Sequence, residues 1–255
     1  MILKKLVCAT VISASAIASL AGSAHALVAP SSPVNLIVNG SFEDTTLAGT
    51  NQAQLTGDNK TWKTYDRING WSATPNGKIE VQRGGVAGSP YQGSNLVELD
   101  SHGYTANNFS QQNPLGIYQD VATVAGKTYT LSFAYSARPD TKAVDNVFDV
   151  LVRDAANLGN NIFRDTVSAG DGAKTTVWSI FTKTFTATSQ LSRVQFNYTG
   201  PLNTLGAYID DVKLVSVSKV DVPEPSAIAG IVVVGLGLVT FKKRNALKKS
   251  LSMGN

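Results

Sequence analysis

The central part of this 255-residue sequence predicts an all-β domain, a two-sheet antiparallel jelly-roll sandwich. In residues 129–135 large apolar side chains alternate with small ones, which is typical of a half-buried strand. Turn-forming pairs such as Asn39-Gly40 and Asp171-Gly172 separate similar runs, and no stretch between them shows sustained helical periodicity. The other predicted strands are 36–38, 78–83, 95–99, 116–121, 147–153, 161–167, 178–187, 192–198 and 207–217. Long connections at 44–70 and 100–115 favour a jelly roll over a tight meander.

The first 26 residues have the features of a secretory signal peptide. Lys4 and Lys5 precede an apolar and small-residue stretch at 6–21, and Ala24-His25-Ala26 supplies a cleavage site between small residues. Cleavage there removes Cys8, the one cysteine of the sequence. A mature chain beginning at Leu27 is therefore expected to have neither disulfide bonds nor thiol chemistry.

The segment 222–255 has three parts in a fixed order. Val222-Pro223-Glu224-Pro225 (222–225) leads into an uncharged apolar run at 226–241, and a basic end follows at 242–249, beginning Lys242-Lys243-Arg244. As a helix the 16-residue run would extend about 24 Å, less than the ~30 Å hydrocarbon core of a bilayer. The residues alone leave two alternatives, a permanent single-pass transmembrane anchor and a temporary sorting signal.

This tail resembles the PEP-CTERM sorting signal of exported bacterial proteins, with Pro223, Glu224 and Pro225 as the motif and 242–244 as the basic end. The resemblance implies that an exosortase-type membrane protease is a partner and that the motif is its substrate. It also implies an exported protein that is transiently held in the inner membrane and finally reaches the cell surface or the extracellular space. The transmembrane run then belongs to a temporary intermediate.

The net charge of +4 comes from the two ends of the chain. The signal peptide carries two of the 22 basic residues, and the tail carries five more together with one of the 18 acidic residues. The body at 27–221 is left with 15 basic and 17 acidic residues, a net charge of about −2. It lacks the basic footprint of a nucleic-acid-binding protein, and its length suits one domain.

A second resemblance covers most of residues 35–217. Residues 35–43 and 207–214 look like the opening and closing strands of galactose-binding-like jelly rolls, which include many carbohydrate-binding modules, and 98–101, 118–121 and 126–133 fit the middle. The resemblance implies a structural calcium ion that joins the first and last strands, with Glu43 and Asp210 or Asp211 as ligands. The alternatives are that Asp210 faces solvent or pairs with a basic residue, and that Glu43 is a turn residue.

A catalytic role is not predicted. His102 follows Glu98 and Asp100 closely, but adjacent residues at a strand end point to alternate faces, whereas a hydrolase triad needs groups that converge. The aromatic residues in or beside the long loops suggest sugar binding by ring stacking; they are Trp62, Tyr65, Trp71, Tyr91 and Tyr104. The alternative is that these aromatic side chains are packed in the hydrophobic core.

The sequence therefore predicts a non-enzymatic protein of the cell surface or extracellular matrix that binds or organises exopolysaccharide. Two other functions stay open. One is a secreted hydrolase of polysaccharide that uses Asp100 or His102, and the other is a matrix protein with no specific ligand.

Overall fold

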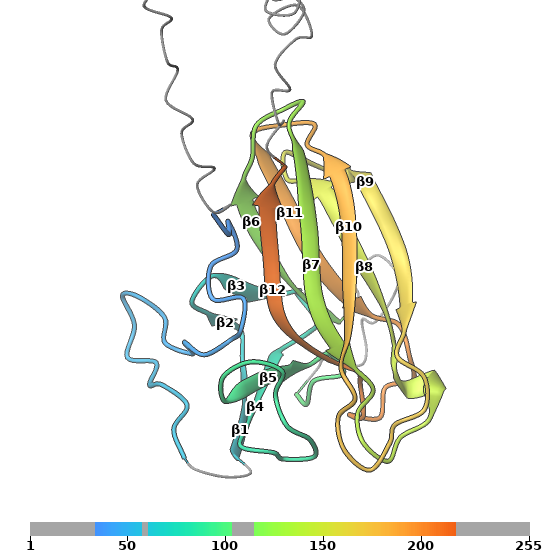
Figure 1. The fold of residues 1–255 in the computed structure, drawn as a ribbon. Helices are drawn as coiled ribbons and strands as arrows, with labels where there is room; N and C mark the ends of the chain where they lie inside the picture. Colours follow the sequence, from blue (N-terminus) through green and yellow to red (C-terminus); the bar gives the residue numbers. More distant parts are fainter. Residues whose placement is uncertain (1–33, 58–60, 104–114, 218–255) are drawn as a thin grey trace, which may run out of the picture. The chain divides into compact units, whose positions relative to one another are not determined.

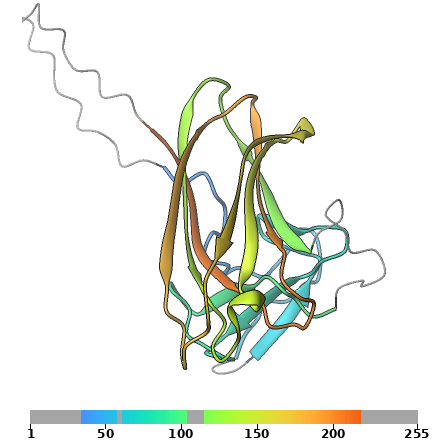
Figure 2. The same cartoon turned by 90° about the vertical axis from the view of Figure 1, so that its right-hand side faces the viewer.

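The computed structural model describes residues 34–57, 61–103 and 115–217. They form two antiparallel six-stranded sheets that face each other, as Figures 1 and 2 show. In spatial order, sheet A contains β1 (Thr61–Tyr65), β4 (Ile79–Arg83), β5 (Asn95–Glu98), β12 (Tyr208–Ser216), β7 (Thr128–Ser136) and β10 (Ser179–Thr186). Sheet B contains β2 (Arg67–Ile68), β3 (Trp71–Ala73), β6 (Gly116–Ala122), β11 (Leu191–Tyr198), β8 (Val147–Asp154) and β9 (Asn157–Ser168). The predicted all-β, two-sheet antiparallel sandwich is confirmed.

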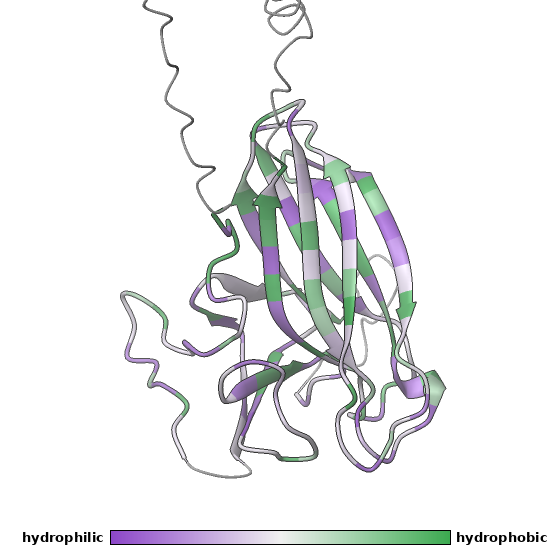
Figure 3. Cartoon of the chain, viewed as in Figure 1, coloured by the Kyte–Doolittle hydropathy of each residue, from purple (hydrophilic) through white to green (hydrophobic). Residues whose placement is uncertain are grey.

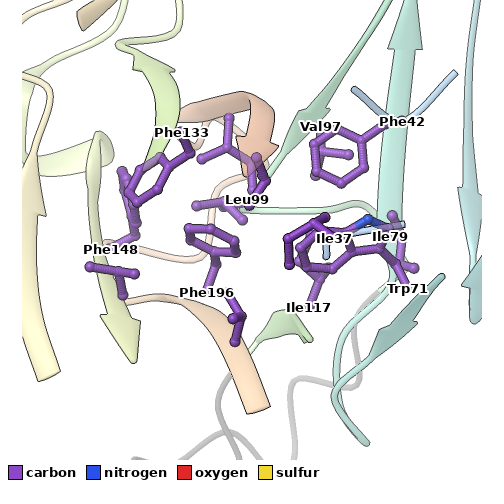
Figure 4. Packing of buried hydrophobic residues seen from close by; sticks show 14 of the residues in the cluster. Ile37, Phe42, Trp71, Ile79, Val97, Leu99, Ile117, Phe133, Phe148 and Phe196 are labelled. Atoms are coloured by element: carbon purple, nitrogen blue, oxygen red, sulfur yellow. The ribbon is translucent and has the colours of Figure 1, made fainter. Parts of the chain in front are cut away.

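The hydrophobic core lies between the two sheets. Hydrophobic and hydrophilic residues alternate along strands such as β9, β10 and β12 (Figure 3), so each strand directs one set of side chains inward. Phe133 of sheet A meets Phe196 of sheet B edge to face at 4.9 Å between ring centroids, and Phe148 packs beside both (Figure 4). Burial of these aromatic rings stabilises the contact between the layers.

The first described residues run beside the last strand. The backbone N–H of Leu36 donates to the Leu214 carbonyl at 2.8 Å, and the Val212 N–H donates to the Gly40 carbonyl at 2.9 Å. A Cβ at Gly40 would lie 2.0 Å from the Val212 carbonyl oxygen, so this close approach requires glycine. The strand predicted at 36–38 is absent there; a single bridge joins Asn35 to Val215 instead.

One segment that was expected to be a long loop contains strands. The segment 44–70 was expected to be a connection, yet β1 and β2 lie within it, and β3 follows at Trp71. These strands are short, and β1 is an edge strand with exposed Trp62 and Lys63. Because an edge strand buries little on either face, its sequence carries only a weak period-two pattern.

The predicted signal peptide at 1–26 and the predicted tail at 222–255 lie outside the described residues. Within the described ranges, no helix has both the length and the apolar character needed to cross a bilayer.

Candidate functional site

Glu43, a predicted calcium ligand, anchors the end of the loop that joins β4 to β5, residues 84–94. Its Oε1 accepts hydrogen bonds from the backbone N–H groups of Ser94 and Asn95, each at 2.8 Å. Gly93, at φ 69°, leaves room for this carboxylate, since a Cβ there would lie 2.4 Å from Oε1. The other oxygen, Oε2, lies 3.9 Å from the Arg83 guanidinium.

Asp210, the second predicted ligand, holds the same loop from the last strand. Its buried Oδ2 accepts the N–H groups of Tyr91 at 2.8 Å and Gln92 at 2.9 Å, and its Oδ1 accepts the N–H of Asp211 at 2.6 Å. Burial raises the pKa of Asp210 to about 7, although these three N–H donors oppose the shift. Asp211 turns away and pairs with Lys213 at 2.6 Å.

The three predicted ligands do not form an acidic cluster. Within the described part of the chain, no group of three or more His, Cys, Asp or Glu residues is placed to hold one metal ion. Calcium needs six to eight oxygen ligands, whereas Glu43 and Asp210 already accept backbone N–H donors, whose positive ends would repel a cation. The described geometry thus does not fit calcium well, and calcium binding stays a prediction.

Asp100 and His102 do not contact each other as a catalytic pair would. Asp100 Oδ2 accepts the backbone N–H groups of residues 203–205, at 2.5 to 3.3 Å, and so fixes the loop before β12. His102 Nδ1 lies 2.7 Å from Glu80 Oε2 instead, and its ring packs at a tilt against Trp62 with 4.6 Å between ring centroids. A hydrolase built on Asp100 and His102 gains no support from these contacts.

A buried polar network that the sequence interpretation did not identify lies beside His102. Gln82 Nε2 donates to Glu80 Oε1 at 3.0 Å and also to Glu98 Oε2, while Arg138 Nε donates to Glu98 Oε1 at 3.1 Å. Burial, and then the charge of Glu80, raise the pKa of Glu98 well above its usual value. The alternation in β4 could have placed Glu80 and Gln82 on one face, but only the pairing of β4 with β5 brings Glu98 opposite Glu80.

The five predicted sugar-binding aromatic residues divide into different environments. Tyr65 and Trp71 are 4% and 1% exposed and belong to the core, where Trp71 contacts Phe42 at 5.2 Å, so the sugar-binding prediction is wrong for these two. Trp62 and Tyr91 are 45% and 47% exposed. Tyr104 lies outside the described residues, as do all residues of the sorting motif, Val222, Pro223, Glu224, Pro225, Lys242, Lys243 and Arg244.

The two exposed aromatic residues belong to different local clusters. Trp62 packs at a tilt against His102, whereas Tyr91 meets Trp178 edge to face at 6.0 Å. The Trp178 indole N–H is bound to the Ser89 carbonyl at 3.0 Å, which holds that ring against the loop at 84–94.

The outer face of sheet B combines an aromatic ring with amides. Ile117, Val194 and Phe196 point into the core, so alternation directs their strand neighbours outward. Tyr118 of β6 then lies opposite Gln195 of β11 and opposite Ser72 of β3. We call this surface the Tyr118 face, made by Ser72, Tyr118, Arg193, Gln195 and Asn197.

Contacts within the Tyr118 face hold its side chains in place. The Arg193 guanidinium lies 3.8 Å from the centroid of the Tyr118 ring and donates to both oxygens of Asp120, at 2.7 and 2.8 Å. Gln195 Nε2 donates to Asn197 Oδ1 at 2.6 Å, and both amides are 5% exposed. Each of these planar groups is therefore held in place by a neighbouring side chain.

A pocket of about 340 Å³ opens beside Tyr118. Its polar lining residues are Asp66, Arg67, Ser72 and Thr74. This volume and these hydrogen-bonding side chains suit a small polar ring next to an aromatic wall. This site could not be predicted from the sequence, because Ser72, Tyr118 and Gln195 belong to three separated segments that only the strand register aligns.

No protein-family model and no curated protein matches this chain. Solved structures do match. A family 16 carbohydrate-binding module is 20% identical with a TM-score of 0.36, covering 71% of this chain and 99% of that one. TmCBM61, in complex with β-1,4-galactotriose, is 16% identical with a TM-score of 0.42, covering 72% and 99%. An arabinose-bound α-L-arabinofuranosidase, MgGH51, is 13% identical with a TM-score of 0.44, covering 71% of this chain and 26% of the enzyme.

Proposed function

We propose that the β-sandwich binds polysaccharide, without cleaving it, through the Tyr118 face. The observation that carries this proposal is the fixed aromatic ring of Tyr118 in the wall of a polar pocket. Sugar rings offer apolar C–H faces for stacking and hydroxyl groups that both donate and accept. An aromatic ring beside the polar side chains of Asp66, Arg67 and Ser72 matches both properties.

The buried carboxylates give less support to a hydrolytic function than the Tyr118 face gives to binding. A glycosidase needs two carboxyl groups that flank a substrate cleft. Glu80 and Glu98 lie close together through Gln82, but both are 1% exposed and their oxygens are bound to protein donors. Asp100 is fully buried with three backbone partners on one oxygen. The proposed role is therefore binding.

A glycan array on the mature protein tests this proposal and separates it from a purely structural role. We expect binding to at least one polysaccharide, with Tyr118→Ala weakening it about tenfold or more, which corresponds to ~1.4 kcal/mol. Tyr91→Ala is the matched control, because Tyr91 is an exposed tyrosine outside the Tyr118 face. Binding that Tyr91→Ala removes and Tyr118→Ala leaves intact would contradict this site. Release of reducing ends would favour a hydrolase.

We further propose export and C-terminal processing. The signal peptide at 1–26 would direct secretion, the run at 226–241 would hold the chain transiently in the inner membrane, and an exosortase-type protease would cut near Pro223-Glu224-Pro225. Support comes from the order of motif, apolar run and basic end in the sequence. The final location would be the cell surface or the extracellular matrix, where exopolysaccharide is the proposed ligand.

The mass of the mature protein tests both cleavages at once. We expect a chain that begins at Leu27 and ends near 222–225, together with the mass of any attached group. A mature surface protein that still contains Phe241 would show a permanent anchor instead.

A further inference from the structure

Three arginines lie on adjacent strands of the outer face of sheet B. Arg193 of β11 is directly opposite Arg153 of β8. Arg164 of β9 is opposite Leu151, two residues along β8 from Arg153. Residues two apart on a strand share a face, and directly paired residues do as well, so all three side chains project to the same side as Tyr118.

Two of the three arginines are neutralised by aspartates. Arg193 forms a two-pronged pair with Asp120, at 2.7 and 2.8 Å. Arg164 binds Asp149, with Nε donating to Oδ2 at 2.8 Å. The Arg193 pair has the fork geometry that arginine favours for carboxylates, whereas both donors of Arg164 reach one oxygen of Asp149. Neither cation is left without a carboxylate partner.

Arg153 has no such partner. Its Nε is buried without a hydrogen-bond acceptor in the described part of the chain, and no carboxylate there forms an ion pair with it. Burial, and then the charges of Arg164 and Arg193, lower the pKa of Arg153. The strand register shifts on both sides of Arg153 in its pairing with β9. Such irregularities redirect side chains and are frequent next to functional sites.

This arrangement costs the free protein stability. Like charges directly opposite each other on neighbouring strands are destabilising, and a buried donor without an acceptor adds the cost of its lost hydration. A bound anion at the partly exposed Arg153 guanidinium would remove the first cost, because it would offset the surplus positive charge. A purely structural role for Arg153 would explain neither feature.

We infer that Arg153, with Arg193 and Arg164 beside it, forms an anion subsite of the Tyr118 face that receives the carboxylate of an acidic, uronic-acid-containing polysaccharide. This inference rests on the proposed polysaccharide binding and names its substrate class. Arg193 connects the two parts, since it stacks on Tyr118 and lies opposite Arg153. From β6 to β8 is two strand spacings, about 10 Å, so one sugar can contact Tyr118 while the carboxylate of a neighbouring sugar reaches Arg153.

Calorimetric titration with matched polymers tests the subsite. The ligands are oligomers of polygalacturonate, polyglucuronate and alginate, each compared with the same oligomer after reduction of its carboxyl groups to hydroxymethyl groups. We expect at least one acidic oligomer to bind about tenfold or more tightly than its reduced form, and the difference to shrink as salt rises.

Arg153→Gln should remove this preference while leaving binding of the reduced oligomer unchanged. Arg153→Lys should keep part of it, because the charge stays and the guanidinium fork is lost. Lys127→Gln makes the same charge change at an exposed turn outside sheet B's outer face and should behave as wild type. The melting temperature of free Arg153→Gln should not fall below that of wild type, since an unfavourable charge is removed.

The possible outcomes distinguish failure of the anion subsite from failure of polysaccharide binding. If acidic and reduced oligomers bind equally well and Tyr118→Ala weakens both, the anion subsite is overturned and polysaccharide binding stands. The subsite is equally overturned if Arg153→Gln keeps the full preference for the acidic form. If neither form of any polymer binds to wild type, both the subsite and polysaccharide binding through this face are wrong.

Discussion

Replacing Asp210 by alanine should lower the free energy of unfolding by about 3–4 kcal/mol. The side chain is fully buried, and its two oxygens accept the backbone N–H groups of Tyr91, Gln92 and Asp211. Each buried N–H left without an acceptor costs about 1–3 kcal/mol, reduced where the loop can move toward water. Urea unfolding followed by circular dichroism measures the change.

Two further variants show whether the loop at 84–94 is the cause. Lys213→Ala, which removes a half-exposed neighbour, should change stability by no more than about 0.5 kcal/mol. Glu43→Ala should destabilise as well, and the double variant should lose less than the two single losses together, because both carboxylates hold one loop. A loss below about 1 kcal/mol for Asp210→Ala would show that its hydrogen bonds do not anchor the loop.

Wild-type stability should fall as the pH rises from about 5 to 8, and Glu98→Gln should reduce that fall. The folded-state pKa of Glu98 is raised by burial and by Glu80, so the native state keeps a proton that the unfolded chain releases above about pH 4.5. Between these two pKa values each such group lowers the stability by up to ~1.4 kcal/mol per pH unit. Asp210 acts in the same direction between its usual pKa and about 7.

Glutamine at position 98 can keep the carbonyl oxygen that accepts from Arg138 and Gly206. Its amide can donate to Gln82 Oε1, which has no hydrogen-bond partner among the described residues, if the Gln82 amide rotates. Urea unfolding at several pH values measures the slope for wild type and Glu98→Gln. Asp140→Asn, at an exposed ion pair with Lys174, should leave the slope unchanged. A wild-type stability that rises steadily from pH 5 to 8 would contradict a protonated Glu98.

Most strands of the fold could be predicted because they alternate along their length. The run predicted at 129–135 is β7 almost to the residue, and those at 147–153 and 192–198 match β8 and β11. The first three strands could not be predicted, since β2 and β3 have two and three residues and β1 lies at an edge. Such elements are specified by their pairing partners more than by their own pattern.

The candidate site was harder to predict than the fold. Glu43 and Asp210 were expected to be calcium ligands, which stays a prediction. In the structure both hold the 84–94 loop, and their partners are backbone N–H groups of residues that no motif contains. The Tyr118 face depends on the register of β3, β6 and β11. In sequence Tyr118 and Gln195 are ordinary polar positions of alternating strands.

Chemical-shift mapping of the isotope-labelled domain, titrated with a polyuronate oligomer, tests most directly whether the outer face of sheet B is the binding surface. We expect the largest changes at Tyr118, Arg153, Arg193 and Gln195, with little change at Trp62 or Tyr91. Changes concentrated at Trp62 or Tyr91, with none at Tyr118, would contradict it.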